Sequence, residues 1–131
     1  MLSCGDTFLI PKSKNEVEHL WVVVTEPGED GRAVCVNIST RQEYSDSTVV
    51  LKPGEHPYIK HDSIVYYTDA QVLDLNSVEA ALNAKTRSFV CQDHESCSEA
   101  LLKRIQKGLI DSPHTPKGIK KDCRILWGVK S

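Results

Sequence analysis

Residues 19–40 read HLWVVVTEPGEDGRAVCVNIST, and this stretch decides the fold. Its two outer parts are apolar and rich in β-branched residues, and its middle is a cluster of turn-forming residues. The pattern predicts a β-hairpin with strands at about 19–25 and 32–39 and a loop at 26–31. Both strands are almost continuously apolar, so we expect other elements to cover both of their faces.

Shorter apolar runs predict the remaining elements. Strands are expected at 6–10, 47–51 and 64–67, with 70–73 as a further strand or a bent extension, a short extended piece at 58–59 and a last strand at 87–91. Short helices are expected at 74–85, with Val78, Ala81 and Leu82 on one face, and at 116–124, after a Thr115 cap. The clearest helix follows Ser96, because Ser96 and Glu99 match a capping box and apolar residues then recur at helical spacing through Ile110.

Many short strands, few helices and close turns predict a mainly β (α+β) fold. We expect a small, closed barrel of five to six strands over residues 4–91. The amphipathic helix from Ser96 is expected to cover its core, and Trp127 to anchor the C-terminal end. Residues 1–131 suit a single domain, with 96–131 as a helical and basic segment.

Composition indicates a soluble protein of the cytoplasm. The chain has 131 residues, 40% of them hydrophobic, and a net charge of −2. No apolar run approaches the length of a membrane span, and the first residues lack the basic end and apolar block of a secretory signal. Five cysteines cannot all pair within the chain, and reduced thiols fit a cytosolic setting. Cys35 is expected to be a small buried filler in its strand.

The charge is unevenly distributed along the chain. Residues 101–131 carry eight basic and two acidic side chains, although the whole chain is slightly acidic. A basic end can contact phosphates or an acidic partner, or it can be an ordinary solvated surface. The candidates for nucleic-acid contact are four residues at helical spacing: Lys117, Lys120, Lys121 and Arg124.

The order of segments over roughly residues 4–110 resembles the MazF/PemK/Kid group of toxins. Gly5-Asp6 opens the first strand, the apolar strand from His19 follows, and the next strand ends in hydroxyl residues at Ser39 and Thr40. A strand from Asp62 and one amphipathic helix complete the series. The resemblance implies an SH3-like barrel, a homodimer, ribonuclease activity and an antitoxin-like protein partner.

The chain departs from that family at positions that matter for cleavage. Family members typically have an arginine followed by proline where this chain has His19 and Leu20. One subgroup has an arginine and an aspartate where this chain has Tyr66 and Thr68, with Asp69 next to them. The resemblance therefore implies altered cleavage machinery.

Cleavage of RNA without metal needs a base, an acid and a group that stabilises the phosphate charge. His19 and His61 are candidates for proton transfer, with His56 a weaker one. Arg41 can bind phosphate with two donors, and Ser39 and Thr40 can position it. The alternative is structural: these residues begin or end strands, form turns or lie on the surface. We expect no cofactor for this chemistry.

A second cluster is Cys91, His94 and Cys97, with Cys123 later in the chain. Thiolate and imidazole groups suit tetrahedral zinc, but the spacing is not that of a standard zinc motif. The alternatives are incidental thiols in a loop, or a reactive Cys97 near the start of a helix.

Three functions remain open from the sequence. The first is a toxin-type protein that acts, or once acted, on RNA as a metal-independent endoribonuclease. The second is a non-catalytic barrel that binds a protein partner or nucleic acid through its basic end. The third is a zinc-stabilised interaction protein.

Overall fold

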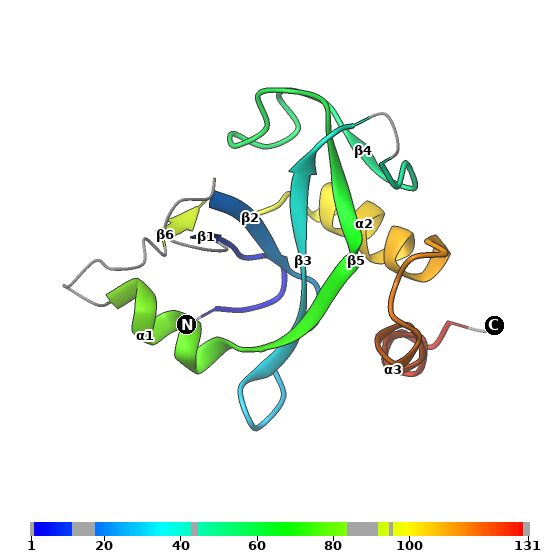
Figure 1. Ribbon diagram of the computed structural model, residues 1–131. Coiled ribbons are helices and arrows are strands. Elements are labelled where there is room, and N and C mark those ends of the chain that lie inside the picture. Colours follow the sequence, from blue (N-terminus) through cyan, green and yellow to red (C-terminus); the bar gives the residue numbers. More distant parts are fainter. Residues whose placement is uncertain (1, 12–17, 43–44, 84–91, 95, 130–131) are drawn as a thin grey trace.

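The computed structural model describes residues 2–11, 18–42, 45–83, 92–94 and 96–129. It contains a six-stranded antiparallel sheet and three helices (Figure 1). The strands are β1 (Thr7–Pro11), β2 (Glu18–Val23), β3 (Arg32–Thr40), β4 (Val50–Leu51), β5 (Ser63–Asp74) and β6 (Gln92–His94). The helices are α1 (Leu75–Asn83), α2 (Glu99–Asp111) and α3 (Lys117–Trp127).

The predicted hairpin is confirmed and lies at the centre of the sheet. The strand order is β4-β5-β3-β2-β1-β6, so β3 pairs with β2 on one edge and with β5 on the other. Residues Ala33 to Ile38 are all buried, which confirms that both faces of β3 are covered. The expected α+β class with a mainly antiparallel sheet is also confirmed. Among the described residues the sheet curls but ends at β4 and β6, so the expected closed cylinder is seen only as a half-barrel.

One face of the sheet forms the larger core, under α2 and α3. Apolar residues of the sheet pack there against residues of both helices. The sheet contributes Leu20, Val22, Val36 and Val65, α2 contributes Leu101, Ile105 and Leu109, and α3 contributes Cys123. Trp127 is half-buried against the same core, as expected. The Tyr67 hydroxyl is buried here and donates a hydrogen bond to the Ile105 carbonyl oxygen at 2.7 Å, which ties β5 to α2.

The opposite face forms a smaller core, under α1. This core contains four buried residues of the sheet and two of α1: Phe8, Trp21, Val23 and Cys35 with Leu75 and Val78. The prediction that Cys35 is a buried filler is confirmed, since its side chain is 0% exposed. Of the expected apolar face of α1, Val78 is buried as predicted, Ala81 is exposed, and the Leu82 side chain lies outside the described residues. Leu75 also packs in this core.

Both C-terminal helices occur where the sequence predicts them, but their N-terminal caps differ. The N-cap of α2 is Ser98, whose hydroxyl accepts the Leu101 N–H, so the predicted capping box from Ser96 is wrong. The Ser96 hydroxyl instead donates to Asp6 at 2.7 Å and ties the start of α2 to the start of β1. Thr115 likewise does not cap α3, because its hydroxyl donates to the Leu109 carbonyl oxygen.

Strand β5 is long, bent and only partly paired on its outer edge. Cys35 pairs with Gln71 and Asn37 pairs with Tyr66, so a single residue of β3 lies opposite residues 67–70 of β5. This irregularity confirms the bent extension expected after the 64–67 strand. On the other edge, β4 pairs only with Ser63 and Ile64. Helix α3 packs beside β5 (Figure 1).

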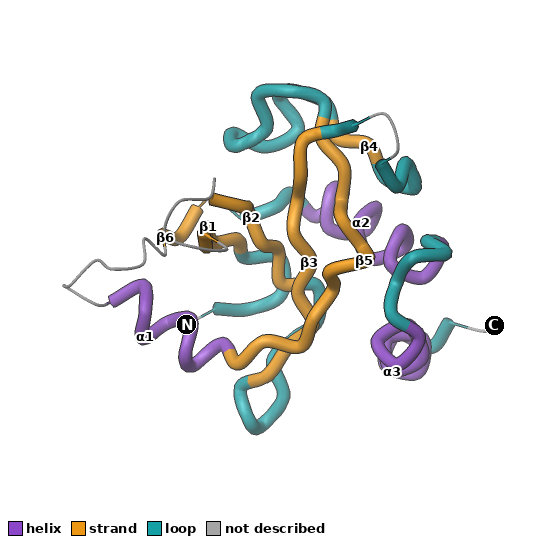
Figure 2. The backbone as a smooth tube through the Cα atoms, in the orientation of Figure 1, coloured by secondary structure: helices purple, strands orange, loops and turns teal. Residues whose placement is uncertain are grey.

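Three smaller expectations have different outcomes. The 47–51 strand is reduced to Val50 and Leu51, because Asp46 accepts hydrogen bonds from Thr48 and turns the chain there. Residues 58–59 lie in a hydrogen-bonded turn within the loop from β4 to β5, at the upper end of the molecule in Figure 2. The strand expected at 87–91 lies outside the described residues. No helix in the described ranges is long and apolar enough to cross a membrane.

Gly108 generates a prediction about the larger core. A Cβ atom at this position would overlap the Tyr67 Oη and Val49 Cγ2 atoms. We expect Gly108→Ala to lower the free energy of unfolding by about 1–3 kcal/mol, because overpacking outweighs the helix propensity of alanine. Urea denaturation would measure it. The matched control is Gly118→Ala in α3, where a Cβ atom meets nothing within 4 Å and no loss is expected. Equal stabilities of the two variants would contradict this account.

Candidate functional site

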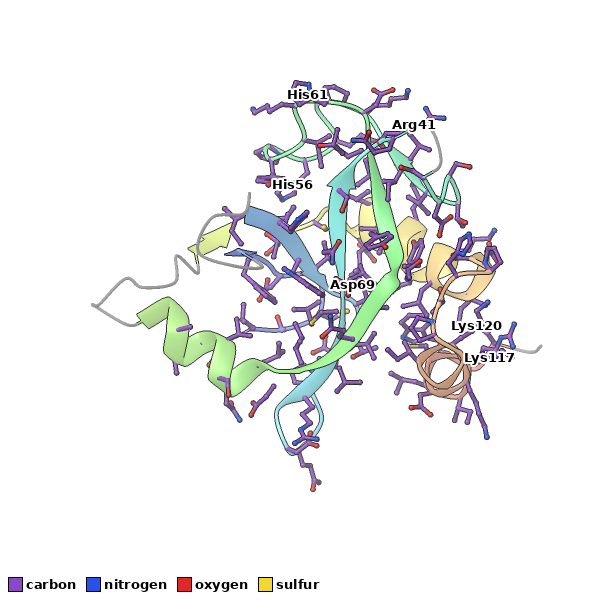
Figure 3. The ribbon with its side chains drawn as sticks, viewed as in Figure 1. Arg41, His56, His61, Asp69, Lys117 and Lys120 are labelled. Carbon is purple, nitrogen blue, oxygen red and sulfur yellow. The ribbon has the colours of Figure 1, made fainter. Side chains whose placement is uncertain are left out.

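The strand ends bring several of the predicted site residues to one end of the sheet. β2 begins near His19, β3 ends with Ser39 and Thr40, and β5 begins at Ser63. Neighbouring strands among these three are antiparallel. The start of β2, the end of β3 and the start of β5 therefore meet at the same end of the sheet. The loop that carries His61 folds over this end of the sheet, where Figure 3 shows His61 and Arg41.

A pocket of about 260 Å³ opens at this end, and we call it the histidine pocket. Four of the five residues predicted to be catalytic line it, together with four residues that were not predicted. The predicted ones are His19, Ser39, Thr40 and His61, and the others are Ile38, Tyr58, Lys60 and Ser63. The volume is below the roughly 300–1,000 Å³ typical of sites for drug-sized ligands, so the pocket suits a small group.

Arg41, the fifth predicted residue, lies beside the histidine pocket and is not part of its lining. Its backbone N–H donates to the Asp62 carbonyl oxygen at 2.9 Å, and its guanidinium lies 4.0 Å from the Asp62 carboxylate. Lys52 contacts the same carboxylate at 2.7 Å. The hydrogen bond from Lys52 is the main cause that holds the pKa of the Asp62 carboxyl below its usual range. The positive charge of Arg41 lowers this pKa further.

The loop between β4 and β5 is held in place by contacts at both ends. The Ser63 hydroxyl donates to the His61 carbonyl oxygen at 2.9 Å, next to the pocket. At the other end, Arg104 of α2 pairs with Glu55 and also donates to the Val50 carbonyl oxygen at 3.0 Å. The pKa of Glu55 is lowered, first by the Lys52 backbone N–H and then by Arg104. Helix α2 therefore fixes the loop that supplies Tyr58, Lys60 and His61.

His56, the weaker candidate, has a structural position. Its side chain is only 3% exposed, and its Nδ1 atom accepts the Tyr58 backbone N–H at 3.1 Å. This hydrogen bond shapes the turn, and His56 is not among the residues that line the histidine pocket.

The histidine pocket favours an anion. The described residues of its lining include one lysine and two histidines and no carboxylate. Lys60 and His61 are exposed and His19 is half-buried, so solvent reaches all three side chains. The nearest carboxylate on the loop, Asp62, is already engaged by Lys52 and Arg41. A phosphate group therefore suits the pocket by charge and by size.

A series of side-chain hydrogen bonds centred on the buried Asn37 leads to the wall of the histidine pocket. Asn37 is 0% exposed, and its Nδ2 atom donates to Asp69 at 2.6 Å across the irregularity in β5. The Asn37 Oδ1 atom accepts the Ser39 hydroxyl at 3.4 Å, and the other Asp69 oxygen accepts from Gln71 at 3.1 Å. Irregular strand pairing of this kind is over-represented next to active sites. Here it brings Asp69 to a buried amide that orients Ser39.

The four basic residues predicted to contact nucleic acid lie on α3, away from the histidine pocket. Their spacing places them along one stripe of the helix. Lys117 and Lys121 are exposed, whereas Lys120 and Arg124 are half-buried. The Lys120 ammonium donates to the Ser112 carbonyl oxygen at 2.6 Å, near the end of α2, and thus has a structural contact of its own.

The predicted zinc cluster falls largely outside the described residues, which include neither Cys91 nor the His94 side chain. Cys97 is described and is half-buried against the larger core. Burial raises the pKa of its thiol to about 11, which argues against a reactive Cys97. Within the described residues, no group of three or more histidine, cysteine or acidic side chains is placed to hold a metal ion.

Sequence reasoning missed Lys60, Tyr58 and the Asn37–Asp69 pair. Asn37 had a visible signal, because it is the one amide in an otherwise apolar part of β3. Asp69 was named only as a neighbour of the diverged positions Tyr66 and Thr68, because it lies among other polar residues of β5. No sequence signal distinguishes Lys60 from other surface lysines, since its place depends on how the loop folds back.

The Asn37–Asp69 pair generates a stability prediction. We expect Asp69→Ala to lower the free energy of unfolding by about 1–3 kcal/mol, because it removes the acceptor of a buried amide. The control is Gln71→Ala, which removes only the exposed hydrogen bond to Asp69 and should cost less than about 0.5 kcal/mol. Chemical denaturation of both variants gives the comparison. A loss for Asp69→Ala no larger than that of its control would show that the pair does not stabilise the fold.

Comparison with known proteins assigns no family to this chain. No protein-family model matches its sequence, and no curated protein matches it either. Its chemistry is therefore argued from the residues of the histidine pocket and their surroundings.

Proposed function

We propose that this chain is a MazF/PemK-like protein with an SH3-like barrel that cleaves RNA without a metal ion. One observation carries the proposal: His19, His61, Ser39 and Thr40, named from three separate parts of the sequence, line a single pocket. The same pocket contains Lys60, so it combines two groups for proton transfer with a cation.

The proposed reaction is a transfer of the phosphoryl group within the RNA strand. One histidine removes the proton of a ribose 2′-hydroxyl, and the 2′-oxygen forms a bond to the adjacent phosphorus. The bond from phosphorus to the 5′-oxygen breaks, and the other histidine protonates that oxygen. The products are a 2′,3′-cyclic phosphate and a 5′-hydroxyl end.

The remaining residues of the pocket bind and position the phosphate. Lys60 supplies positive charge where the phosphate oxygens gain charge in the transition state. Thr40 donates a hydrogen bond, and Ser39, whose hydroxyl donates to Asn37, positions the phosphate from the wall of the pocket. Arg41 contributes long-range attraction from beside the pocket, where it is shared with Asp62. A homodimer and an antitoxin-like partner belong to the proposal through the family resemblance.

The test is an incubation of the purified protein with mixed-sequence RNA in the presence of a chelator. We expect cleavage with cyclic phosphate ends, and a fall in kcat of about 10²- to 10⁴-fold for His19→Ala and for His61→Ala. Lys60→Ala should slow cleavage, whereas the control Lys103→Ala, on the exposed face of α2, should not. Intact RNA after long incubation, or wild-type rates from both histidine variants, would refute the proposal.

The second candidate is a non-catalytic module that binds RNA through α3. It is favoured by the stripe of Lys117, Lys120, Lys121 and Arg124, whose first and third members are exposed.

Under the second candidate, Lys117→Glu combined with Lys121→Glu should weaken RNA binding and reduce its salt dependence. Losing two phosphate contacts lowers the slope of log K against log salt by about 1.4 for single strands. Fluorescence anisotropy over a salt series measures this slope. Lys103→Glu is the control, and an unchanged slope in the double variant would exclude α3 as the RNA-binding surface.

A further inference from the structure

A second pocket, which we call the tyrosine pocket, adjoins the histidine pocket and has about 360 Å³. Ser39 and Thr40 belong to the lining of both, so the end of β3 forms a shared wall. The rest of the lining comes from β5, from the loop after β3 and from the turn between α2 and α3: Gln42, Ser45, Asp46, Ile64, Tyr66, Thr68 and His114.

The two pockets differ in charge. The histidine pocket is lined by Lys60 and two histidines, and no carboxylate is among its described lining residues. Among the described residues that line the tyrosine pocket there is neither lysine nor arginine, and they include Asp46 and His114. Burial acts to raise the pKa of Asp46, but hydrogen bonds from Ser112 and Thr48 outweigh it and hold the pKa below its usual range. Asp46 is therefore ionised at neutral pH, and the tyrosine pocket disfavours a phosphate.

The tyrosine pocket offers an aromatic surface beside polar groups. Ile64, Tyr66 and Thr68 alternate along β5 with buried residues and share one side of the strand. Tyr66 is 36% exposed, in contrast to its neighbour Tyr67, which is 0% exposed. The polar groups of the lining include the hydroxyls of the shared wall, the Gln42 amide and, on the turn side, the Asp46 carboxylate and His114. Stacking on an aromatic ring with hydrogen bonds to the base edge is how proteins bind unpaired RNA bases.

We propose that the tyrosine pocket binds one base of the RNA whose phosphate occupies the histidine pocket, with Tyr66 as the stacking surface. This inference rests on the proposed function, since it assigns a base-binding residue beside the proposed site of cleavage. Ser39 and Thr40 line both pockets, so the two pockets are adjacent. A nucleotide likewise carries an anionic phosphate and a neutral planar base close together, so one nucleotide can occupy both pockets.

The test measures binding separately from cleavage. The probe is a fluorescent 2′-O-methyl hexaribonucleotide, which has no free 2′-hydroxyl and cannot be cleaved by the proposed reaction. We expect Tyr66→Ala to weaken binding about tenfold or more in anisotropy titrations, and Tyr66→Phe to stay within twofold of the wild type, because it keeps the ring. Val72→Ala is the matched control, since Val72 is also on β5, is 51% exposed and lies outside the tyrosine pocket.

Probes with one abasic residue at successive positions identify the bound base. We expect one abasic position to weaken binding to the wild type about as much as Tyr66→Ala does, with no further loss when the two changes are combined. Equal binding by wild type and Tyr66→Ala, or additive losses, would overturn the proposal.

A further measurement uses only the wild-type chain, so its result does not depend on whether the Tyr66 variants fold. RNA containing 5-iodouridine, irradiated in the complex, should form a cross-link that maps by mass spectrometry to the peptide with Tyr66. Cross-links found only elsewhere would overturn the proposal. Absence of cleavage with these binding results intact would remove the ribonuclease activity and leave the base-binding pocket, so the two failures are distinguishable.

Discussion

Strand β3 is buried on both faces and hydrogen-bonded on both edges, and the other elements are arranged around it. Pairing with β2 and β5 satisfies its backbone groups, while α2 and α1 help to cover its two faces. A strand in this environment must be apolar along its length, which is why Asn37 stands out. Its amide is satisfied only because β5 departs from regular pairing at that point. The same strand then ends at the wall shared by the two pockets.

The sequence predicted the centre of the fold well because burial leaves a clear pattern there. The β2–β3 hairpin, α2 and the extent of β5 follow from apolar runs and helical spacing. The cap of α2 was misplaced because two serines, Ser96 and Ser98, both suit an N-cap, and tertiary contact with Asp6 decided between them. The 47–51 strand was overestimated because the hydrogen bonds of Asp46 bend the chain locally.

The site was only partly predictable for a related reason. Residues at strand ends, such as His19 and Ser39, could be named because strand limits are visible in the sequence. Lys60 and Tyr58 reach the histidine pocket through the folded path of a loop, which is fixed by Arg104 from a distant helix. The Asn37–Asp69 contact depends on the register of β3 against β5. Neither the loop path nor the register leaves a local pattern in the chain.

The short length of β4 has a consequence for how molecules of this protein meet. Val65 still donates a backbone hydrogen bond to Val49 at 3.3 Å, but beyond Val65 the outer edge of β5 pairs with no strand among the described residues, and α3 packs beside β5. An uncovered strand edge is a template on which another chain can add a strand. A helix packed beside a strand is one of the ways in which folds limit the access of another chain to such an edge, and α3 is placed in this way.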